Sequence, residues 1–243
     1  MRRSTLAILL SVLVLVGVLV VVLVFGVIPY PEYASLIDQP DNSIPGTIAF
    51  VRGDDPPCAM TIPAGGGPAT EVGCSWEMGG EGLAWTADGL LVTLDFTGSP
   101  AQYVLIDPAS GEIVDRIDTA LNGPEPLFKR PNATRLDGAV VTVGAMYTAD
   151  RSNNGAVIWV SRQGAKAMVL LKVDGPRDYR FETAIWSPDG NWILVSDSLD
   201  RLLIVRADGD PTPRILVEDV QPWNRSAWYL PGFTEGTFDI PGR

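Results

Sequence analysis

The chain has 243 residues, of which 18 are Lys or Arg and 29 are Asp or Glu, giving a formal net charge of −11 at pH 7. This acidic balance argues against binding to nucleic acid or to anionic lipid headgroups, since both attract basic patches. The chain contains no histidine, which excludes Ser-His-Asp and Cys-His catalysis and histidine-ligated metal sites.

The first feature along the chain is an apolar segment, residues 5–28, preceded by Arg2 and Arg3. A helix of this length reaches roughly 36 Å, enough to cross a hydrocarbon core of about 30 Å. A cleaved signal peptide is the alternative, but its apolar region typically has about 7–15 residues and ends at a small-residue cleavage site. We therefore expect an uncleaved transmembrane signal-anchor. The positive-inside rule then leaves residues 1–4 in the cytoplasm and places residues 29–243 outside it.

Residues 29–45 follow the anchor and contain four prolines, which predicts a semi-rigid spacer. Residues 46–243 are then expected to form one extracytoplasmic domain. Proline and glycine are spread along this region, and long amphipathic helical patterns are missing, which is typical of many short strands and turns. The predicted fold class is all-β. The acidic surface is interpreted first as a source of solubility.

The two cysteines, Cys58 and Cys74, lie on either side of Ala64–Gly67, which has the composition of a turn between two short strands. Folding this hairpin would bring them nearly opposite each other, at a Cβ separation close to that of a disulfide. Outside the cytoplasm the pair should be oxidised. Closing a loop of this size stabilises a fold by about 3 kcal/mol. The alternative is two unpaired small core residues.

A short sequence recurs through the domain. Leu83–Gly89 reads Leu-Ala-Trp-Thr-Ala-Asp-Gly, Ala184–Gly190 reads Ala-Ile-Trp-Ser-Pro-Asp-Gly, and each precedes an apolar run. Leu136–Gly138 (Leu-Asp-Gly) precedes a third apolar run. With two weaker copies included, the repeated glycines are spaced 43, 49, 52 and 42 residues apart: Gly46, Gly89, Gly138, Gly190 and Gly232. This period is the size of one four-stranded propeller blade.

The repeated residues have a structural interpretation. Asp-Gly accepts the positive φ angles that hairpin turns require, and apolar runs without alternation suit strands that are buried on both faces. The aspartates could instead be metal ligands, and the tryptophans could stack on a ligand, but turn formation and packing between blades explain them more simply. The residues assigned these structural roles are Trp85, Asp88, Gly89, Asp137, Gly138, Trp186, Asp189 and Gly190.

Trp186-Ser187-Pro188-Asp189-Gly190, followed by its apolar strand, resembles the signature repeat of TolB-like β-propellers, which are related in architecture to WD-repeat propellers. The resemblance covers roughly residues 46–232 and implies a propeller of about four to five four-stranded blades. Such propellers serve as binding modules in the periplasm or at the cell surface, and as gating domains in front of peptidases. We also expect Ser226–Leu230 to complete the blade begun by Thr47–Val51.

Two segments are longer than blade turns need to be, residues 122–135 and 148–155. Propellers commonly bind partners through loops at one end, so these are candidate contact loops, although two solvated insertions remain the alternative. The candidate contact residues are Phe128, Lys129, Arg130, Asp150, Arg151, Asn153 and Asn154.

The sequence carries neither a Gly-x-Ser-x-Gly elbow nor a glycine-rich phosphate loop, and we expect no cofactor and no metal. The expected function is non-catalytic binding of a protein or cell-surface component by a domain tethered to the lipid bilayer through its anchor. The alternative from another class is a carbohydrate- or peptide-handling enzyme or enzyme-accessory propeller, because glycosidase chemistry needs only two carboxylates. A degenerate propeller fragment with little function of its own is the third possibility.

Overall fold

The computed structural model describes residues 41–243 except 76–81, 120–133, 136, 148–153, 163–164, 177, 209–211, 222–225, 235–236 and 240–243. The expected cytoplasmic segment 1–4, the expected anchor 5–28 and residues 29–40 of the expected spacer lie outside the described residues. In the described part of the chain, no helix has the length and apolar character needed to cross a membrane.

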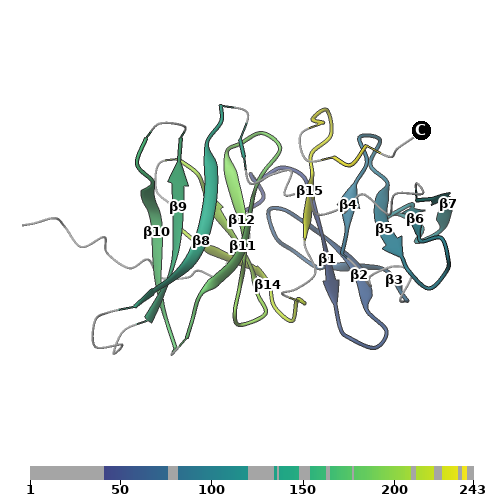
Figure 1. Cartoon of the computed structure of the whole chain (residues 1–243), viewed down its shortest axis with the longest axis horizontal. Coiled ribbons are helices and arrows are strands. Elements are labelled where there is room, and N and C mark those ends of the chain that lie inside the picture. Colours follow the sequence, from purple (N-terminus) through teal and green to yellow (C-terminus); the bar gives the residue numbers. More distant parts are fainter. Residues whose placement is uncertain are drawn as a thin grey trace, which may run out of the picture. The chain divides into compact units, whose positions relative to one another are not determined.

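Every regular element of the described chain is a β-strand, and the strands form four antiparallel sheets (Figure 1). The all-β fold class is therefore confirmed. Sheet 1 has the order β15-β1-β2-β3, sheet 2 β4-β5-β6-β7, sheet 3 β10-β9-β8 and sheet 4 β11-β12-β13-β14. Neighbouring strands are mostly consecutive in sequence, which is the up-and-down topology of a propeller blade.

The strand bounds are as follows. Sheet 1 contains β1 (Thr47–Arg52), β2 (Cys58–Pro63), β3 (Thr70–Cys74) and β15 (Ala227–Tyr229). Sheet 2 contains β4 (Ala84–Trp85), β5 (Leu91–Asp95), β6 (Gln102–Ile106) and β7 (Ile113–Asp118). Sheet 3 contains β8 (Val140–Tyr147), β9 (Asn154–Ser161) and β10 (Met168–Gly175). Sheet 4 contains β11 (Phe181–Trp186), β12 (Trp192–Asp197), β13 (Leu202–Arg206) and β14 (Arg214–Val217).

Sheet 1 is assembled from both ends of the domain. β15 pairs with β1, with Ile48 opposite Trp228, so the pairing predicted between Ser226–Leu230 and Thr47–Val51 is confirmed at its centre. The Trp228 indole N–H donates to the Pro45 carbonyl at 3.1 Å. Residues 41–45, which the sequence assigns to the spacer, pack on this sheet: Ile44 is 4% exposed, and the Asp41 N–H donates to the Gly65 carbonyl.

The third repeat departs from the others at the tryptophan position. Trp85 lies opposite Leu91, Trp186 opposite Ile193 and Trp228 opposite Ile48. In sheet 3 the equivalent contact is a single bridge between Thr134 and Val140, so a threonine stands where the other sheets have tryptophan. Within the described residues, sheet 3 has three strands.

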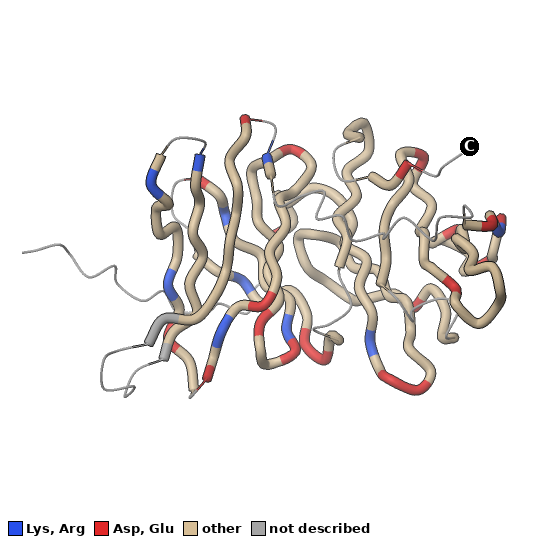
Figure 2. Tube along the Cα trace, in the orientation of Figure 1, with Lys and Arg blue, Asp and Glu red and all other residues tan. Residues whose placement is uncertain are grey.

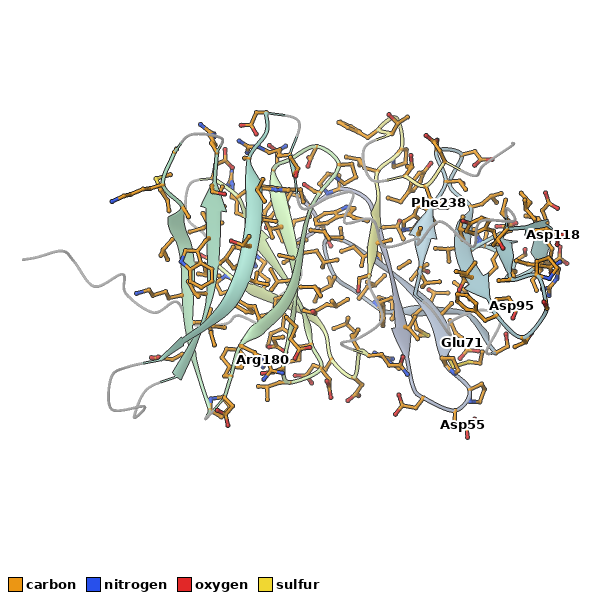
Figure 3. The ribbon with its side chains drawn as sticks, viewed as in Figure 1. Asp55, Glu71, Asp95, Asp118, Arg180 and Phe238 are labelled. Atoms are coloured by element: carbon orange, nitrogen blue, oxygen red, sulfur yellow. A yellow bond between two sulfur atoms is a disulfide. The ribbon has the colours of Figure 1, made fainter. Side chains whose placement is uncertain are left out.

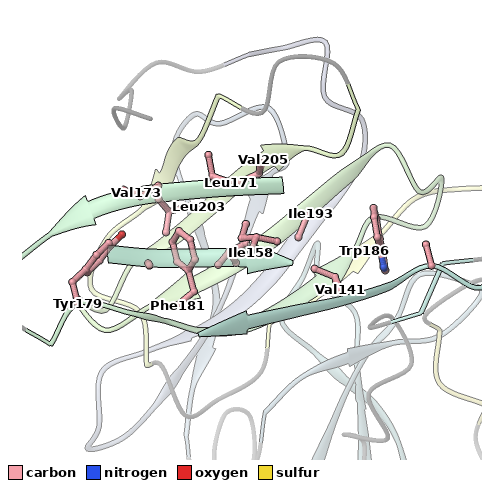
Figure 4. Close-up of a cluster of buried hydrophobic side chains, with 13 residues drawn as sticks. Val141, Ile158, Leu171, Val173, Tyr179, Phe181, Trp186, Ile193, Leu203 and Val205 are labelled. Carbon is pink, nitrogen blue, oxygen red and sulfur yellow. The ribbon is translucent and has the colours of Figure 1, made fainter. Parts of the chain in front are cut away.

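The sheets are joined by apolar clusters. One cluster joins sheet 3 to sheet 4 (Figure 4), a second joins sheet 4 to sheet 1, and a third joins sheet 1 to sheet 2. The fourth cluster lies on the other face of sheet 2, where Phe238 packs against Tyr103 with ring centroids 5.1 Å apart. The central strands are buried on both faces, as in β5, where every residue from Leu91 to Asp95 is buried.

The structure contains the expected disulfide between Cys58 and Cys74. The two residues lie directly opposite each other in the β2–β3 pair, with a Cα separation of 3.9 Å. Their position follows from the hairpin, because the turn between β2 and β3 sets the register that makes them cross-strand neighbours.

Candidate partner-binding face

The two ends of each sheet carry different kinds of connections between strands. We call one the loop end: it carries the connections between the second and third strands, residues 53–57, 96–101, 148–153 and 198–201. The other is the turn end, which carries the Asp-Gly turns between the first and second strands. Because neighbouring strands are antiparallel, the segment that leaves the fourth strand of a sheet also starts at the loop end.

The strands that precede the two predicted contact loops, 122–135 and 148–155, both end at the loop end. Residues 148–153 connect β8 to β9 there, and residues 120–133 follow β7, which ends there at Asp118. Six of the seven candidate residues fall in these two segments, outside the described residues: Phe128, Lys129, Arg130, Asp150, Arg151 and Asn153. Asn154 is the first residue of β9 and lies opposite Tyr147 and Gly175.

The repeated aspartates and glycines form the turn end. Gly89 has φ 85°, and its N–H donates to the Thr86 carbonyl at 3.1 Å, so the turn requires a residue that tolerates positive φ. Equivalent turns form at Gly138 and Gly190, whose N–H groups donate to the carbonyls of Arg135 and Ser187, respectively.

The carboxylates of these turns bond within the turns themselves. Asp137 accepts from the Arg135 guanidinium and from the Ala139 N–H at 3.1 Å, and these hydrogen bonds, that of Arg135 first, lower the pKa of Asp137. Asp189 accepts from the Ser187 hydroxyl and the Asn191 N–H. Asp88 is exposed. The turn chemistry accounts for Asp137 and Asp189 without a metal.

Trp85 and Trp186 are buried at the ends of β4 and β11. The Trp85 indole N–H donates to the Ala227 carbonyl at 3.2 Å, and its ring stacks on Tyr229 with centroids 5.1 Å apart. The Arg135 guanidinium lies 5.0 Å from the centre of the Trp186 ring, and its Nη1 donates to the Gly190 carbonyl at 3.3 Å. Both tryptophans are therefore packing residues between neighbouring sheets.

Sequence reasoning missed the two residues that cover these tryptophans. Tyr229 and Arg135 occupy the same place in the repeat, directly after the tryptophan position, and each covers the tryptophan of the next sheet. The other two sheets have Thr86 and Ser187 there, so the motif itself carried no signal for a long side chain.

A buried ion pair holds the loop end of sheet 4. The Asp197 side chain is 0% exposed and accepts from Arg201 Nη2 at 2.6 Å, from Arg201 Nε at 3.0 Å and from the Tyr179 hydroxyl at 3.0 Å. Burial, followed by the charge of Asp197, raises the pKa of Tyr179. Backbone N–H groups of Leu199 and Arg201 also donate to Asp197. The Asp197 carboxylate therefore stabilises the 198–201 turn through hydrogen bonds, and the positive charge of Arg201 neutralises its negative charge.

Sheet 2 has a counterpart in Asp95, which accepts from the Thr97 N–H and hydroxyl, both at 2.7 Å, and lies 3.6 Å from Arg116 Nη1. Sequence reasoning missed this pair as well. The available signal was an aspartate ending the apolar run in two repeats, in Leu-Val-Thr-Leu-Asp95 and Ile-Leu-Val-Ser-Asp197.

Exposed carboxylates gather at the loop end of sheets 1 and 4. We call this set the acidic rim: Asp54, Asp55, Asp200, Glu218 and Asp219. Backbone hydrogen bonds connect the three segments that carry these carboxylates. The Val220 N–H donates to the Asp200 carbonyl, and the Gln221 N–H donates to the Val51 carbonyl. Arg52 Nη2 donates to the Glu218 carbonyl at 3.0 Å. Figure 2 shows acidic residues at the tip of the β1–β2 connection, where Figure 3 labels Asp55.

The turn end also contains ion pairs between arginines and carboxylates. Asp137 contacts Arg135 and Arg162, Asp208 lies 3.8 Å from Arg206, and Asp41 lies 3.6 Å from Arg214. In sheets 1 and 4, the turn end thus places Asp208 and Asp41 next to arginines, whereas the acidic rim groups five exposed carboxylates on three adjoining segments.

Metal-ligating residues converge at one place in the described chain. Cys58, Glu71 and Cys74 place their ligand atoms within 4.8 Å of one another. The two sulfur atoms are bonded to each other, which leaves a single carboxylate. With the disulfide formed, this group is not a metal site.

Comparison with solved structures finds similarity to TolB from Acinetobacter baumannii, at 16% identity over 71% of this chain and 41% of that one, with a TM-score of 0.26. A calcium-binding protein, regucalcin, from Agrobacterium tumefaciens is 18% identical over 78% of this chain and 61% of that one, with a TM-score of 0.27. The β-propeller domain of Cps50 (Swd1) from Myceliophteria thermophila is 10% identical over 76% of this chain and 74% of that one, with a TM-score of 0.19.

This chain thus spans about two fifths of the TolB chain and three fifths of the regucalcin chain. No protein-family model matches the sequence, and no curated protein matches it. The blade character of the four sheets rests on their strand order and on the repeated register at the tryptophan position.

Proposed function

We propose that this chain is a non-catalytic binding module whose sheets are the blades of a small β-propeller, held to the outer side of a membrane by residues 5–28. The contact face is the loop end, and the partner is a protein or surface component that presents basic groups. The observation that carries this proposal is the difference between the two ends of the sheets.

The loop end has the features of a recognition surface. The two strands that precede the predicted contact loops, β7 and β8, both end there, and the acidic rim adds five exposed carboxylates. Loops on a rigid scaffold are the usual place for binding residues, and unpaired surface charge speeds association with an oppositely charged partner.

The buried groups next to this face support binding over catalysis. Asp197 and Asp95 are the buried carboxylates among the described residues of the loop end, and both accept hydrogen bonds from neighbouring protein groups. A catalytic carboxylate must reach a substrate atom, whereas these two face Arg201, Tyr179 and Thr97.

The test is affinity capture from envelope extracts with the tagged full chain in detergent. One variant replaces Phe128, Lys129 and Arg130 with serine, and a second carries Asp54→Lys and Asp55→Lys. The matched control, Glu112→Lys with Asp208→Lys, makes the same charge change at exposed turn-end residues.

We expect a partner that the wild type and the control retain and that at least one loop-end variant loses, with capture weakening as salt rises. Equal retention by every variant, or equal loss with the control, would contradict a loop-end contact face. Hydrolysis of a sugar or peptide substrate that disappears when one carboxylate is replaced would assign the chain to the enzymes instead.

A further inference from the structure

Three side chains that can bind a metal ion lie together on sheet 1. Cys58 and Cys74 are direct neighbours across β2 and β3, and Glu71 belongs to the same strand as Cys74. The two sulfur atoms and a carboxylate oxygen lie within 4.8 Å of one another, and Glu71 is labelled in Figure 3. The disulfide joins the two sulfur atoms. Its reduction would leave two thiols and a carboxylate side by side on one sheet.

A bulge in β3 places Glu71 beside the cysteines. Residues 71 and 74 are three apart, so in a regular strand their side chains would point to opposite faces of the sheet. The β2–β3 register skips Val72, and Glu71 therefore lies opposite Met60. Cys74 lies opposite Cys58, which shares a face of β2 with Met60. Glu71 and Cys74 thus share that face too, and bulges commonly re-aim side chains in this way at functional sites.

The Glu71 carboxylate is available to a ligand. Glu71 is exposed, and within the described residues no hydrogen bond or ion pair engages it. By contrast, the carboxylates of Asp95, Asp137 and Asp197 all accept hydrogen bonds from neighbouring backbone N–H groups. No partner in the described chain therefore accounts for the placement of Glu71 beside the cysteines.

The disulfide is accessible, and sheet 1 does not depend on it. Cys74 is exposed at the end of β3, the edge strand of the sheet, and exposed disulfides are the ones that thiols typically reduce. The bridge closes a single hairpin, with a sequence separation of 16. β2 also pairs with β1 along its whole length, from Pro63 opposite Thr47 to Cys58 opposite Arg52. The backbone pairing therefore keeps β2 in place when the bridge is open.

Reduction requires two electrons and two protons, which a protein dithiol supplies. The S–S bond between Cys58 and Cys74 breaks, both sulfur atoms become thiols, and the two sulfurs of the dithiol join in a disulfide. A Zn²⁺ ion that then binds both sulfurs releases their two protons to solvent, because the thiolate is the ligand. Side-chain rotation opens the two sulfurs to about 3.8 Å, the separation that two Zn–S bonds of about 2.3 Å require at a tetrahedral angle.

We propose that Cys58, Glu71 and Cys74 form a Zn²⁺ site in the reduced protein, and that the disulfide is the metal-free state of this site. Thiolate sulfur and carboxylate oxygen are both zinc ligands. The chain has no third cysteine and no histidine, so water takes the fourth position. Because the disulfide excludes the ion, the redox state of the protein decides whether zinc is bound. This inference does not depend on the proposed function, since its readout is metal binding.

The first test measures Zn²⁺ binding to the full chain in detergent by competition with a chromogenic chelator. The reduced form is prepared under argon with a phosphine, which supplies no thiol ligand, and is then desalted. We expect one Zn²⁺ per reduced chain and at least about tenfold weaker binding to the oxidised chain, since even outer-shell changes cost about 10–100-fold in metal affinity. Equal binding in both forms, or none in the reduced form, would overturn the proposal.

The second test assigns the ligands. In the reduced form, Glu71→Gln and Cys74→Ser should each weaken Zn²⁺ binding at least about tenfold. Glu112→Gln, the same change at an exposed glutamate of the β6–β7 connection, is the matched control and should bind as the wild type does. Co²⁺ in place of Zn²⁺ should give a thiolate charge-transfer band that Cys58→Ser with Cys74→Ser removes. Wild-type affinity in Glu71→Gln, or a Co²⁺ spectrum without that band, would contradict the assigned ligands.

Thermal unfolding checks that the ion binds the folded chain. Zn²⁺ should raise the Tm of the reduced chain and leave that of the oxidised chain unchanged, because only the reduced native state offers the site. A reduced chain that is unfolded both with and without Zn²⁺, or a Tm that Zn²⁺ does not move, would overturn the proposal.

Discussion

Replacing Trp228 with alanine tests whether β15 is essential to the domain. The Trp228 side chain is 1% exposed and packs in the cluster that joins sheets 1 and 4. A buried Trp covers about 150–250 Å², which at about 25 cal/mol per Å² is worth about 4–6 kcal/mol. Measured Trp→Ala changes cost about 3–5 kcal/mol, and the Pro45 carbonyl also loses its donor.

We therefore expect Trp228→Ala to lower the free energy of unfolding by about 4–5 kcal/mol, which is much of the 5–15 kcal/mol that a typical domain has. At about 2–4 °C per kcal/mol for a domain of this size, the Tm should fall by about 8–20 °C. Far-UV circular dichroism on the full chain in detergent measures both, the free energy from urea unfolding and the Tm from a thermal melt.

Phe233→Ala is the matched control, because Phe233 follows the same strand but is 37% exposed. It should change the free energy of unfolding by less than about 1 kcal/mol. If Trp228→Ala lowered the free energy of unfolding by less than about 1 kcal/mol, the reasoning would be refuted, because sheet 1 would then be stable without the packing of β15. Faster proteolysis within β1 in the Trp228 variant would support it.

Three further predictions concern the buried ion pair, alkaline pH and the disulfide. Asp197→Ala leaves Arg201 without its partner and should cost about 3–5 kcal/mol in urea unfolding; a change under about 1 kcal/mol would contradict the assigned role. The pKa of Tyr179 is raised above its ordinary value of 10.0, so its contribution to stability is fully present below pH 10 and is lost as the pH rises above it. Unfolding followed from pH 8 to 11 should show this decline, and Tyr179→Phe should flatten it; an unchanged slope would argue against the assignment. Removing the disulfide with Cys58→Ser and Cys74→Ser should lower stability by about 3 kcal/mol, and the reduced wild type serves as its control.

The predictable parts of the fold are those in which a short motif has one structural solution. Asp-Gly in the second and fourth repeats predicts a turn with positive φ, and Gly89 and Gly190 have φ of 85° and 72°. The cysteine spacing around a glycine-rich turn predicts the cross-strand disulfide. The pairing of Trp228 with Ile48 follows from completing a partial repeat at each end.

Other features depend on tertiary contacts that a single repeat does not encode. Thr134 stands at the position that tryptophan occupies in the other sheets, and this is visible only when the registers are compared. Asp197 could be recognised as a strand-ending acid, but its partners Tyr179 and Arg201 come from separate connections. Ile44 lies in a proline-rich segment whose composition predicts a spacer, and its burial in sheet 1 comes from packing alone.

The joining of β15 to β1 also sets an order of events during synthesis. Ala49 and Ala227 are direct neighbours across this pair, yet they are separated by about 180 residues of chain. At about 5–20 residues per second, the ribosome takes roughly 10–35 s to make that interval. Throughout this time β1 has one edge without its native neighbour, so sheet 1 stays exposed to proteases and to misassembly. Completion of sheet 1 therefore depends on the last strand, because only a chain synthesised as far as Tyr229 can pair β15 with β1.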